Sequence, residues 1–246
     1  MRSGNPVLKE STFTRPFEDT GERMTLAGTV NKTAILLALT LITAAWTWGQ
    51  FLETRDPASV RSLMLVGALG GLIVALITVF RPTASPYTAP VYALLEGLAL
   101  GGVSAIMEAR FPGIVIQAVG LTFGTLFCLL AAYRSGLIEA TENFKLGVVA
   151  ATGGICVLYL VDFAMGFFGH PIGFIHESGQ MGILFSAFVV VIAALNLVLD
   201  FDFIETGVAQ GAPKYMEWYG AFGLMVTLVW LYLEILRLLA KLRGRN

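Results

Sequence analysis

Long apolar stretches alternate with short polar segments along most of the chain. A run of roughly 20 apolar residues is long enough to cross a bilayer as an α-helix. The pattern therefore predicts an all-α polytopic membrane protein with seven transmembrane helices. The predicted spans cover residues 33–52, 60–80, 87–107, 114–133, 146–168, 181–200 and 219–240. A continuation of the sixth helix past the membrane to residue 205 is compatible with the pattern.

The polar ends of the chain divide it into three predicted parts. Residues 1–32 form a polar N-terminal tail, residues 33–240 the seven-helix transmembrane domain, and residues 241–246 a basic C-terminal tail. Asn31 and Thr33 are candidate caps for the first span. The second span is expected to end at Arg81, because Pro82 cannot continue a helix.

Composition supports a membrane protein. Hydrophobic residues make up 56% of the chain and charged residues 13%, whereas soluble domains are about half apolar and about a quarter charged. The lipid bilayer is therefore the expected partner, and a net charge of -1 gives no reason to expect nucleic acid. Cys128 and Cys156 fall within apolar runs, so we expect small buried side chains and not a disulfide or metal site.

The distribution of basic residues favours a cytoplasmic N-terminus. Cytoplasmic loops of membrane proteins carry an excess of Lys and Arg. With the N-terminus inside, the inner segments hold nine basic residues and the outer loops three, although the basic C-terminal end would raise the outer total to seven. A re-entrant seventh segment, with both ends inside, is the alternative.

The sixth predicted span ends in the acidic stretch N-L-V-L-D-F-D-F-I-E, residues 196–205. An ionisable group within a hydrocarbon span is costly and indicates a functional site. Asn196 and Asp200 are four residues apart and share a helical face, whereas Asp202 lies about 200° around from Asp200 and joins Glu205. We expect the first face to point into the bundle and the second toward water or the membrane surface. A solvated helix end is the alternative for all three acids.

Other ionisable residues in apolar runs are secondary candidates. Glu234 lies in the seventh span three residues before Arg237, and its alternative is a local ion pair. Glu96 and Asp162 lie in the third and fifth spans, where they could line a polar path. His170 and His176 belong to a polar loop, which we expect to be exposed.

Several small-residue pairs also occur in the spans, and such pairs usually allow close helix packing. They are Gly67 with Gly71, Gly97 with Gly101, and Gly120 with Gly124.

The sequence lacks the motifs of common enzyme classes. It has no H-E-x-x-H, no G-x-S-x-G, no Walker A loop and no dinucleotide-binding G-x-G-x-x-G after a strand. We therefore expect neither an enzyme nor a bound cofactor.

Five segments carry a resemblance to a known family. They are S-G-N-P-V-L at residues 3–8, V-N-K-T at 30–33, A-L-L-E-G-L at 93–98, L-N-L-V-L-D-F-D-F-I-E at 195–205 and W-L-Y-L-E-I-L-R-L-L at 230–239. Together they resemble a bacterial branch of the Bax inhibitor-1 family. The resemblance implies a fold whose last helix is central, and a passive calcium leak regulated by pH. It also implies a bacterial inner membrane protein.

The same resemblance implies roles for three residues. Asp200 and Glu234 correspond to a pair of acids that share a proton, and Arg81 corresponds to an arginine that competes for one of them. The second acid is Glu in place of the family's Asp, and the connection between the two acids is longer than in typical members.

The chemistry of such a pair is independent of the family. Two carboxylates held close together cannot both ionise cheaply, so they share a proton. Carboxylate oxygens are also ligands that suit calcium. We therefore predict a pH-sensitive leak for calcium ions, with Asp200 and Glu234 as proton and cation site. The alternatives are a regulatory scaffold that binds another membrane protein and a proton-coupled transporter of a small solute.

Overall fold

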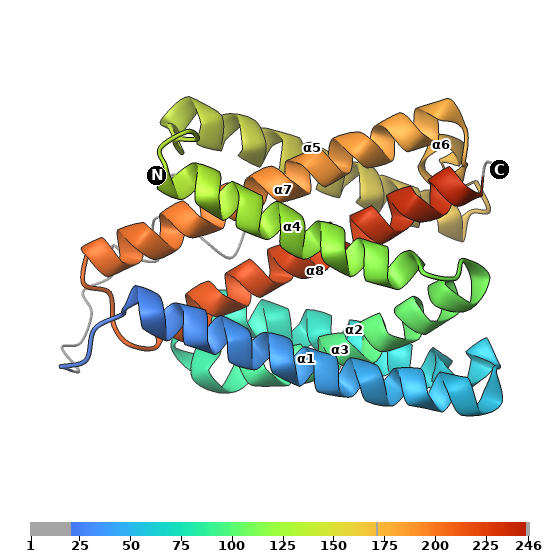
Figure 1. Cartoon of the computed structure of the whole chain (residues 1–246), viewed down its shortest axis with the longest axis horizontal. Helices are drawn as coiled ribbons and strands as arrows, with labels where there is room; N and C mark the ends of the chain where they lie inside the picture. Colours follow the sequence, from blue (N-terminus) through green and yellow to red (C-terminus); the bar gives the residue numbers. More distant parts are fainter. Residues whose placement is uncertain (1–20, 171, 245–246) are drawn as a thin grey trace. The chain divides into compact units, whose positions relative to one another are not determined.

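A computed structural model describes residues 21–170 and 172–244, and every long element within them is a helix (Figure 1). Seven helices in these ranges are long and apolar enough to cross a membrane. They are α1 (Leu26–Thr54), α2 (Pro57–Phe80), α3 (Ser85–Arg110), α4 (Ile114–Arg134), α5 (Glu142–Phe167), α7 (Gln180–Ala209) and α8 (Met216–Arg243). Two short helices, η2 (Pro82–Ala84) and α6 (Gly173–His176), lie between them. The prediction of an all-α polytopic membrane protein is confirmed.

The first helix begins earlier than predicted. The side chain of Thr25 caps α1 by accepting a hydrogen bond from the backbone N–H of Gly28, 3.0 Å away. Asn31 and Thr33 are therefore not its caps, and the predicted boundary between residues 32 and 33 falls inside the helix. Residues 1–20 of the predicted tail, and residues 245–246, lie outside the described residues. At its far end α8 continues to Arg243, past the predicted end at residue 240.

The helices group into two compact units, and α7 and α8 contribute residues to both. The α1–α3 unit comprises residues 21–112 and 203–225. The α4–α5 unit comprises residues 113–170, 172–202 and 226–244.

In the α1–α3 unit, α3 packs against both α1 and α2 through small residues. A Cβ atom added at Gly97 would collide with Thr40 and Thr43 of α1, and one added at Gly67 of α2 would lie 2.5 Å from the carbonyl oxygen of Leu95. Glycine is needed at these positions because the helix backbones approach so closely. The packing role predicted for these glycines is confirmed, whereas Gly120 and Gly124 of α4 have open space around them.

The first half of α8 completes the core of the α1–α3 unit. Tyr219, Phe222 and Met225 are almost completely buried. The ring of Phe222 packs edge-on against Tyr92 of α3, with the ring centroids 5.0 Å apart. Close aromatic pairs of this kind add specific geometry to the area that they bury. The start of α8 is therefore fixed against the helix that the glycines hold in place.

In the α4–α5 unit, α5 packs on α7 and the second half of α8. Ile155 of α5 forms a cluster with Val189 and Ile192 of α7, and Trp230 of α8 packs against it. Of the spanning helices, α8 is the most buried, with 56% of its apolar window inside, compared with 11% for α5. The last helix therefore has the buried character expected of a central helix.

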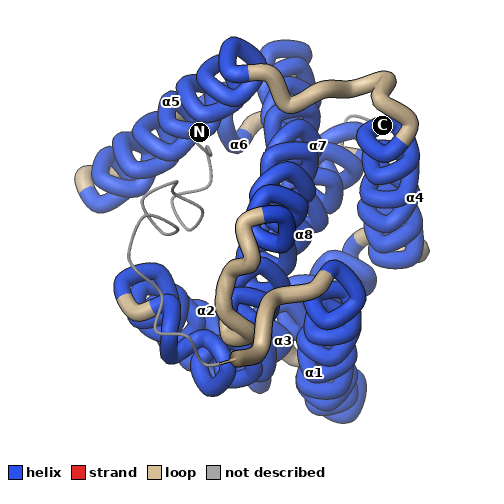
Figure 2. The backbone as a smooth tube through the Cα atoms, turned by 90° about the vertical axis from the view of Figure 1, so that its left-hand side faces the viewer, coloured by secondary structure: helices blue, strands red, loops and turns tan. Residues whose placement is uncertain are grey.

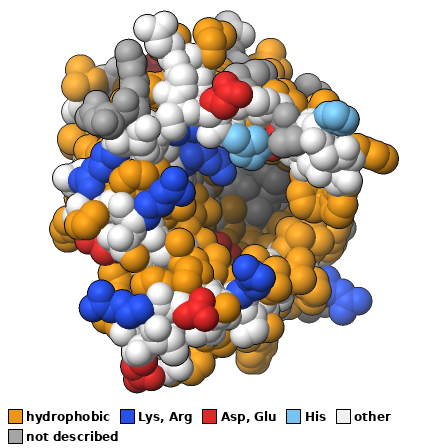
Figure 3. Space-filling view, turned by 90° about the vertical axis from the view of Figure 1, so that its right-hand side faces the viewer, with side chains coloured by type: hydrophobic (Ala, Val, Ile, Leu, Met, Phe, Trp, Pro, Cys, Tyr) orange, Lys and Arg blue, Asp and Glu red, His pale blue; other side chains and the backbone are white. Residues whose placement is uncertain are grey.

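The outward surfaces of the helices are apolar. Leu69 and Ile73 of α2, and Val157 and Phe163 of α5, are large side chains that are more than half exposed. Such surfaces suit contact with lipid. Figure 2 shows these helices joined by loops. Figure 3 shows histidine and charged side chains among hydrophobic ones on one face.

Cys128 and Cys156 are exposed, so the prediction that they are buried is wrong.

Candidate functional site

Asp200 and Asn196 lie on one buried face of α7. Asp200 is 0% exposed and Asn196 is 2% exposed, as predicted for the face that points inward. The Asn196 side-chain amide donates to Thr152 Oγ1 of α5 and to the carbonyl oxygen of Ile192, both at 2.8 Å. Asn196 therefore ties α7 to α5 one helical turn away from Asp200. Because the hydrogen bonds fix Asn196, this face of α7 holds a defined orientation.

Asp202 has a partner that the sequence did not reveal. Its Oδ2 lies 2.7 Å from Nζ of Lys145, in the first turn of α5, and the lysine is only 4% exposed. The Asp202 side chain is 22% exposed, and its place at a solvated helix end stays a prediction. In the sequence, Lys145 belongs to a charged linker. Its spacing of three from Glu142 is the one sequence signal that it lies on a helix, and in the structure the two side chains are 3.5 Å apart.

Glu234 is buried within a polar cluster of its own. Nη1 of Arg237 donates to both carboxylate oxygens of Glu234, at 2.8 and 3.0 Å, and to the hydroxyl of Tyr159 at 2.6 Å. That hydroxyl in turn donates to Glu234 at 3.0 Å. The predicted local pair of Glu234 with Arg237 is present, and Tyr159 of α5 is a member that the sequence analysis missed. The contact could not be predicted from the sequence, because Tyr159 and Glu234 are 75 residues apart and belong to different helices.

The register of α7 and α8 separates Asp200 from Glu234. Lys241 donates to Ser186 Oγ at 2.8 Å, and Trp230 packs near Ile192, so the two helices run antiparallel. At 1.5 Å per residue, Asp200 lies about 21 Å along α7 from Ser186, and Glu234 lies about 10 Å along α8 from Lys241. The two carboxyl groups are therefore offset by about 10 Å or more along the helices. The structure does not bring them together to share a proton directly.

Arg81 ends α2 in the α1–α3 unit. It is the residue at which the helix stops, its side chain is exposed, and its backbone N–H donates to the carbonyl oxygen of Ile77 at 2.8 Å. The predicted end of this span at Arg81 is confirmed. Its role as a latch for Asp200 stays a prediction.

The comparison with known families decides the membership of this chain. The model of the family described as Bax inhibitor 1 like matches residues 5–244, which is nearly the whole sequence. The chain belongs to this family. No curated protein and no solved structure matches it.

The two secondary acids of this Bax inhibitor 1 like protein have local roles in the structure. Asp162 accepts hydrogen bonds from the backbone N–H of Ile172 and from Nε2 of His176, both at 2.8 Å, and so holds the segment around α6. Glu96 of α3 accepts a hydrogen bond from Tyr92. The two acids belong to different units, and a continuous polar path that includes both stays a prediction.

A further buried acid, Glu217 at the start of α8, was absent from the predicted sites. It is 0% exposed and accepts hydrogen bonds from the backbone and hydroxyl of Thr25, at 2.9 and 2.8 Å, and from Lys32. Lys214 lies 3.4 Å away. The signal was hidden because Lys32 is 185 residues distant and was assigned to the tail. This cluster joins the starts of α1 and α8.

Metal-ligating side chains do not gather anywhere in the described part of the chain. Within residues 21–170 and 172–244, no group of three or more His, Cys, Asp or Glu residues is placed to hold a metal ion. Calcium usually takes six to eight oxygen ligands. Asp200 and Glu234 therefore stay predicted contacts of a passing ion.

Proposed function

We propose that this Bax inhibitor 1 like protein is a pH-sensitive leak channel for calcium ions in a bacterial inner membrane. It would act without enzymatic chemistry and without a bound cofactor. The observation that carries the proposal is the complete burial of Asp200 in a helix that is long and apolar enough to span the membrane. Carboxylates in such places mark ion pathways and proton relays more often than they serve stability.

Protonation of Asp200 would set the state of the channel. A neutral carboxyl group is tolerated in an apolar interior, whereas a carboxylate there needs a counterion. Loss of the proton would therefore favour a state in which Arg81 or a passing cation balances the charge. Oxygen ligands and a divalent charge make calcium a suitable ion for that place.

Glu234 would act as a second charge in a separate position. Its carboxylate is already bonded to Arg237 and Tyr159, so its negative charge is balanced locally. We therefore assign the pH response mainly to Asp200 and a smaller electrostatic effect on cation passage to Glu234.

Calcium flux from liposomes tests this proposal. The full chain is reconstituted in vesicles that enclose a calcium-sensitive dye, and influx is measured across pH 5 to 8. Asp200→Asn should abolish the dependence of the flux on pH, because the amide cannot titrate. Asp200→Asn combined with Glu234→Gln should also abolish it. Glu205→Gln is the matched control, since Glu205 is an exposed acid on the same helix.

Two results would contradict the proposal. An unchanged pH response in the Asp200→Asn variant would remove Asp200 as the sensor. An absence of calcium flux from the unmodified protein would remove the channel itself. If a membrane protein then co-purified with the chain, the regulatory scaffold would replace the leak, and solute uptake driven by a pH gradient would indicate the transporter.

A further inference from the structure

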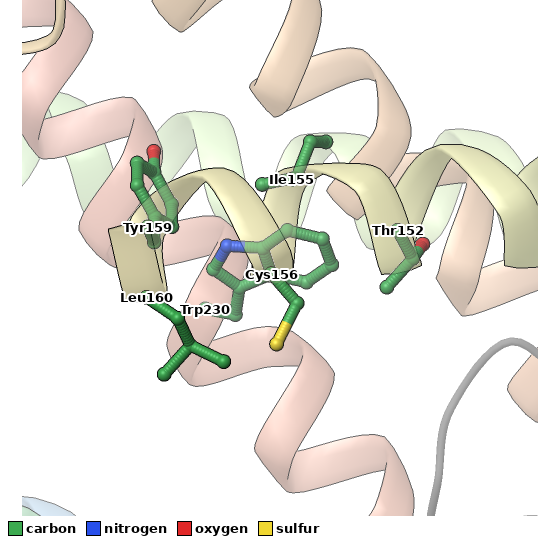
Figure 4. A pocket seen from close by; sticks show the side chains of 6 residues that line it. All are labelled: Thr152, Ile155, Cys156, Tyr159, Leu160 and Trp230. Carbon is green, nitrogen blue, oxygen red and sulfur yellow. The ribbon is translucent and has the colours of Figure 1, made fainter. Parts of the chain in front are cut away.

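A groove lies on the surface of the α4–α5 unit, with a volume of about 330 Å³. Figure 4 shows the five α5 side chains and the indole of Trp230 that line it. The α5 residues recur at spacings of three and four, so they form one face of the helix. They are Thr152, Ile155, Cys156, Tyr159 and Leu160.

The groove offers almost only carbon to an occupant. Its two oxygen-bearing side chains already have protein partners, because Thr152 Oγ1 accepts from Asn196 and the Tyr159 hydroxyl bonds with Glu234 and Arg237. An occupant that fits there is therefore apolar along its length. Leu160 and the neighbouring Val157 are 62% and 60% exposed, so the groove opens on the lipid-facing side of α5.

The position of the groove along α5 corresponds to one leaflet of a bilayer. From Thr152 to Leu160 the helix rises about 12 Å, and the 26 residues of α5 span about 39 Å. With α5 centred on a hydrocarbon core of about 30 Å, the groove begins about 7 Å below the surface of that core and ends about 4 Å past its midplane, so most of its length lies in one leaflet. An acyl chain of a phospholipid occupies this range of depth.

Positive charge lies at the shallow end of the groove. The guanidinium of Arg237 is 5.2 Å from the centre of the Tyr159 ring, and its side chain is 42% exposed. Lys241 and Arg243 follow on the same helix, and two acids, Glu234 and Asp162, interact with Arg237, so the three cations exceed these acids by one. Guanidinium groups bind phosphate well, and long basic side chains in a span reach toward the headgroups.

From the groove and this charge together, we propose that the α4–α5 unit binds one anionic phospholipid, with an acyl chain in the groove and its phosphate at Arg237. This inference does not depend on the proposed calcium leak. It assigns a role to Tyr159 and Arg237 besides their bonds with Glu234. It also explains how an open groove in a membrane-spanning surface is filled.

Fluorescence of Trp230 tests the acyl chain in the groove. Trp46, Trp48 and Trp218 are replaced by Phe, and the full chain is reconstituted in vesicles of phosphatidylcholine with a minor fraction of phosphatidylglycerol. One lipid at a time carries bromine on its acyl chains, which quenches a tryptophan that it contacts. At equal lipid fractions, brominated phosphatidylglycerol should bind at the site about five times more tightly than brominated phosphatidylcholine. This preference corresponds to about 1 kcal/mol, the contribution expected from one basic residue near the membrane surface.

Two pairs of variants separate the groove and the charge from general lipid contact. Cys156→Phe fills the groove and should reduce the quenching of Trp230, whereas Val157→Phe, on the exposed surface one residue away, should leave it unchanged. Arg237→Gln should remove the preference for phosphatidylglycerol, and Arg243→Gln should retain most of it. Circular dichroism checks that each variant keeps its helix content.

Equal quenching by the two lipids in the parent protein would overturn the proposal, because it removes the headgroup contact. Quenching that is insensitive to Cys156→Phe would overturn it as well, because Trp230 would then sense bulk lipid. Mass spectrometry of the parent protein, extracted in mild detergent, gives a readout that needs no substitution. One retained phosphatidylglycerol per chain supports the site, and complete loss of lipid contradicts it.

Discussion

At the scale of single residues, the carboxylate of Glu217 is completely enclosed by the protein. A carboxylate cannot remain ionised in an apolar interior without partners, and here three donors supply them, two from Thr25 and one from Lys32. Lys32 is 18% exposed in its side chain, so the pair is largely shielded from water and salt. The stability of the α1–α3 unit should therefore depend on Lys32.

We expect Lys32→Met to destabilise the protein by about 3 kcal/mol, because it leaves a buried carboxylate without its cation. Lys214→Met is the matched control. Lys214 also lies near Glu217, at 3.4 Å, but its side chain is 44% exposed, so its removal should cost less than about 1 kcal/mol. Thermal unfolding in detergent, followed by circular dichroism, measures both. Equal effects of the two substitutions would contradict the assigned role of Lys32.

At the scale of elements, hydrophobic runs were enough to predict all seven spanning helices and the end of α2 at Arg81. The start of α1 was missed because Lys32 lies in the helix, and a charge near a helix end resembles a boundary in sequence. Its partner Glu217 is distant along the chain. The partner of Asp202 was missed for the same reason, since the buried Lys145 belongs to another helix. Local pattern identifies a helix, but not the partner that allows a charge inside it.

Two glycine-to-alanine substitutions test the packing between helices. At Gly97 of α3, the added methyl group would collide with Thr40 and Thr43 of α1, and the two helices would have to move apart. We expect a loss of about 1–3 kcal/mol from this overpacking. Gly120 of α4 has no neighbour within 4 Å of its added Cβ, so alanine there should be neutral or stabilising by up to about 1 kcal/mol. Unfolding of the two variants in the same detergent gives the comparison, and a stabilising Gly97→Ala would refute the close approach.

At the scale of the whole molecule, the sequence predicted which acids are buried better than it predicted which of them meet. Helical periodicity was enough to predict that Asn196 and Asp200 share one inward face, because the spacing of residues within a single helix decides which of them share a face. The offset of Asp200 from Glu234 depends on the register of α7 against α8. That register is set by contacts such as Lys241 with Ser186, which no local pattern reveals.

The seven spans also make a prediction about topology, because an odd number of crossings places the ends of the described helices on opposite sides of the membrane. If the start of α1 is cytoplasmic, the α1–α2 turn and the end of α8 lie outside, and the α4–α5 loop lies inside. Single cysteines placed in a variant with Cys128→Ala and Cys156→Ala can report these sides. We expect a membrane-impermeant maleimide to label Glu53→Cys and Gly244→Cys in intact cells.

Ser135→Cys, in the α4–α5 loop, should react only after the membrane is made permeable. The reverse pattern would invert the orientation inferred from the basic residues. Labelling of Glu53→Cys without Gly244→Cys would instead show that α8 does not cross the membrane and that both ends are inside. A crossing α8 carries Glu234 and Arg237 toward the outer surface, so the same experiment would also place the proposed phospholipid in the outer leaflet.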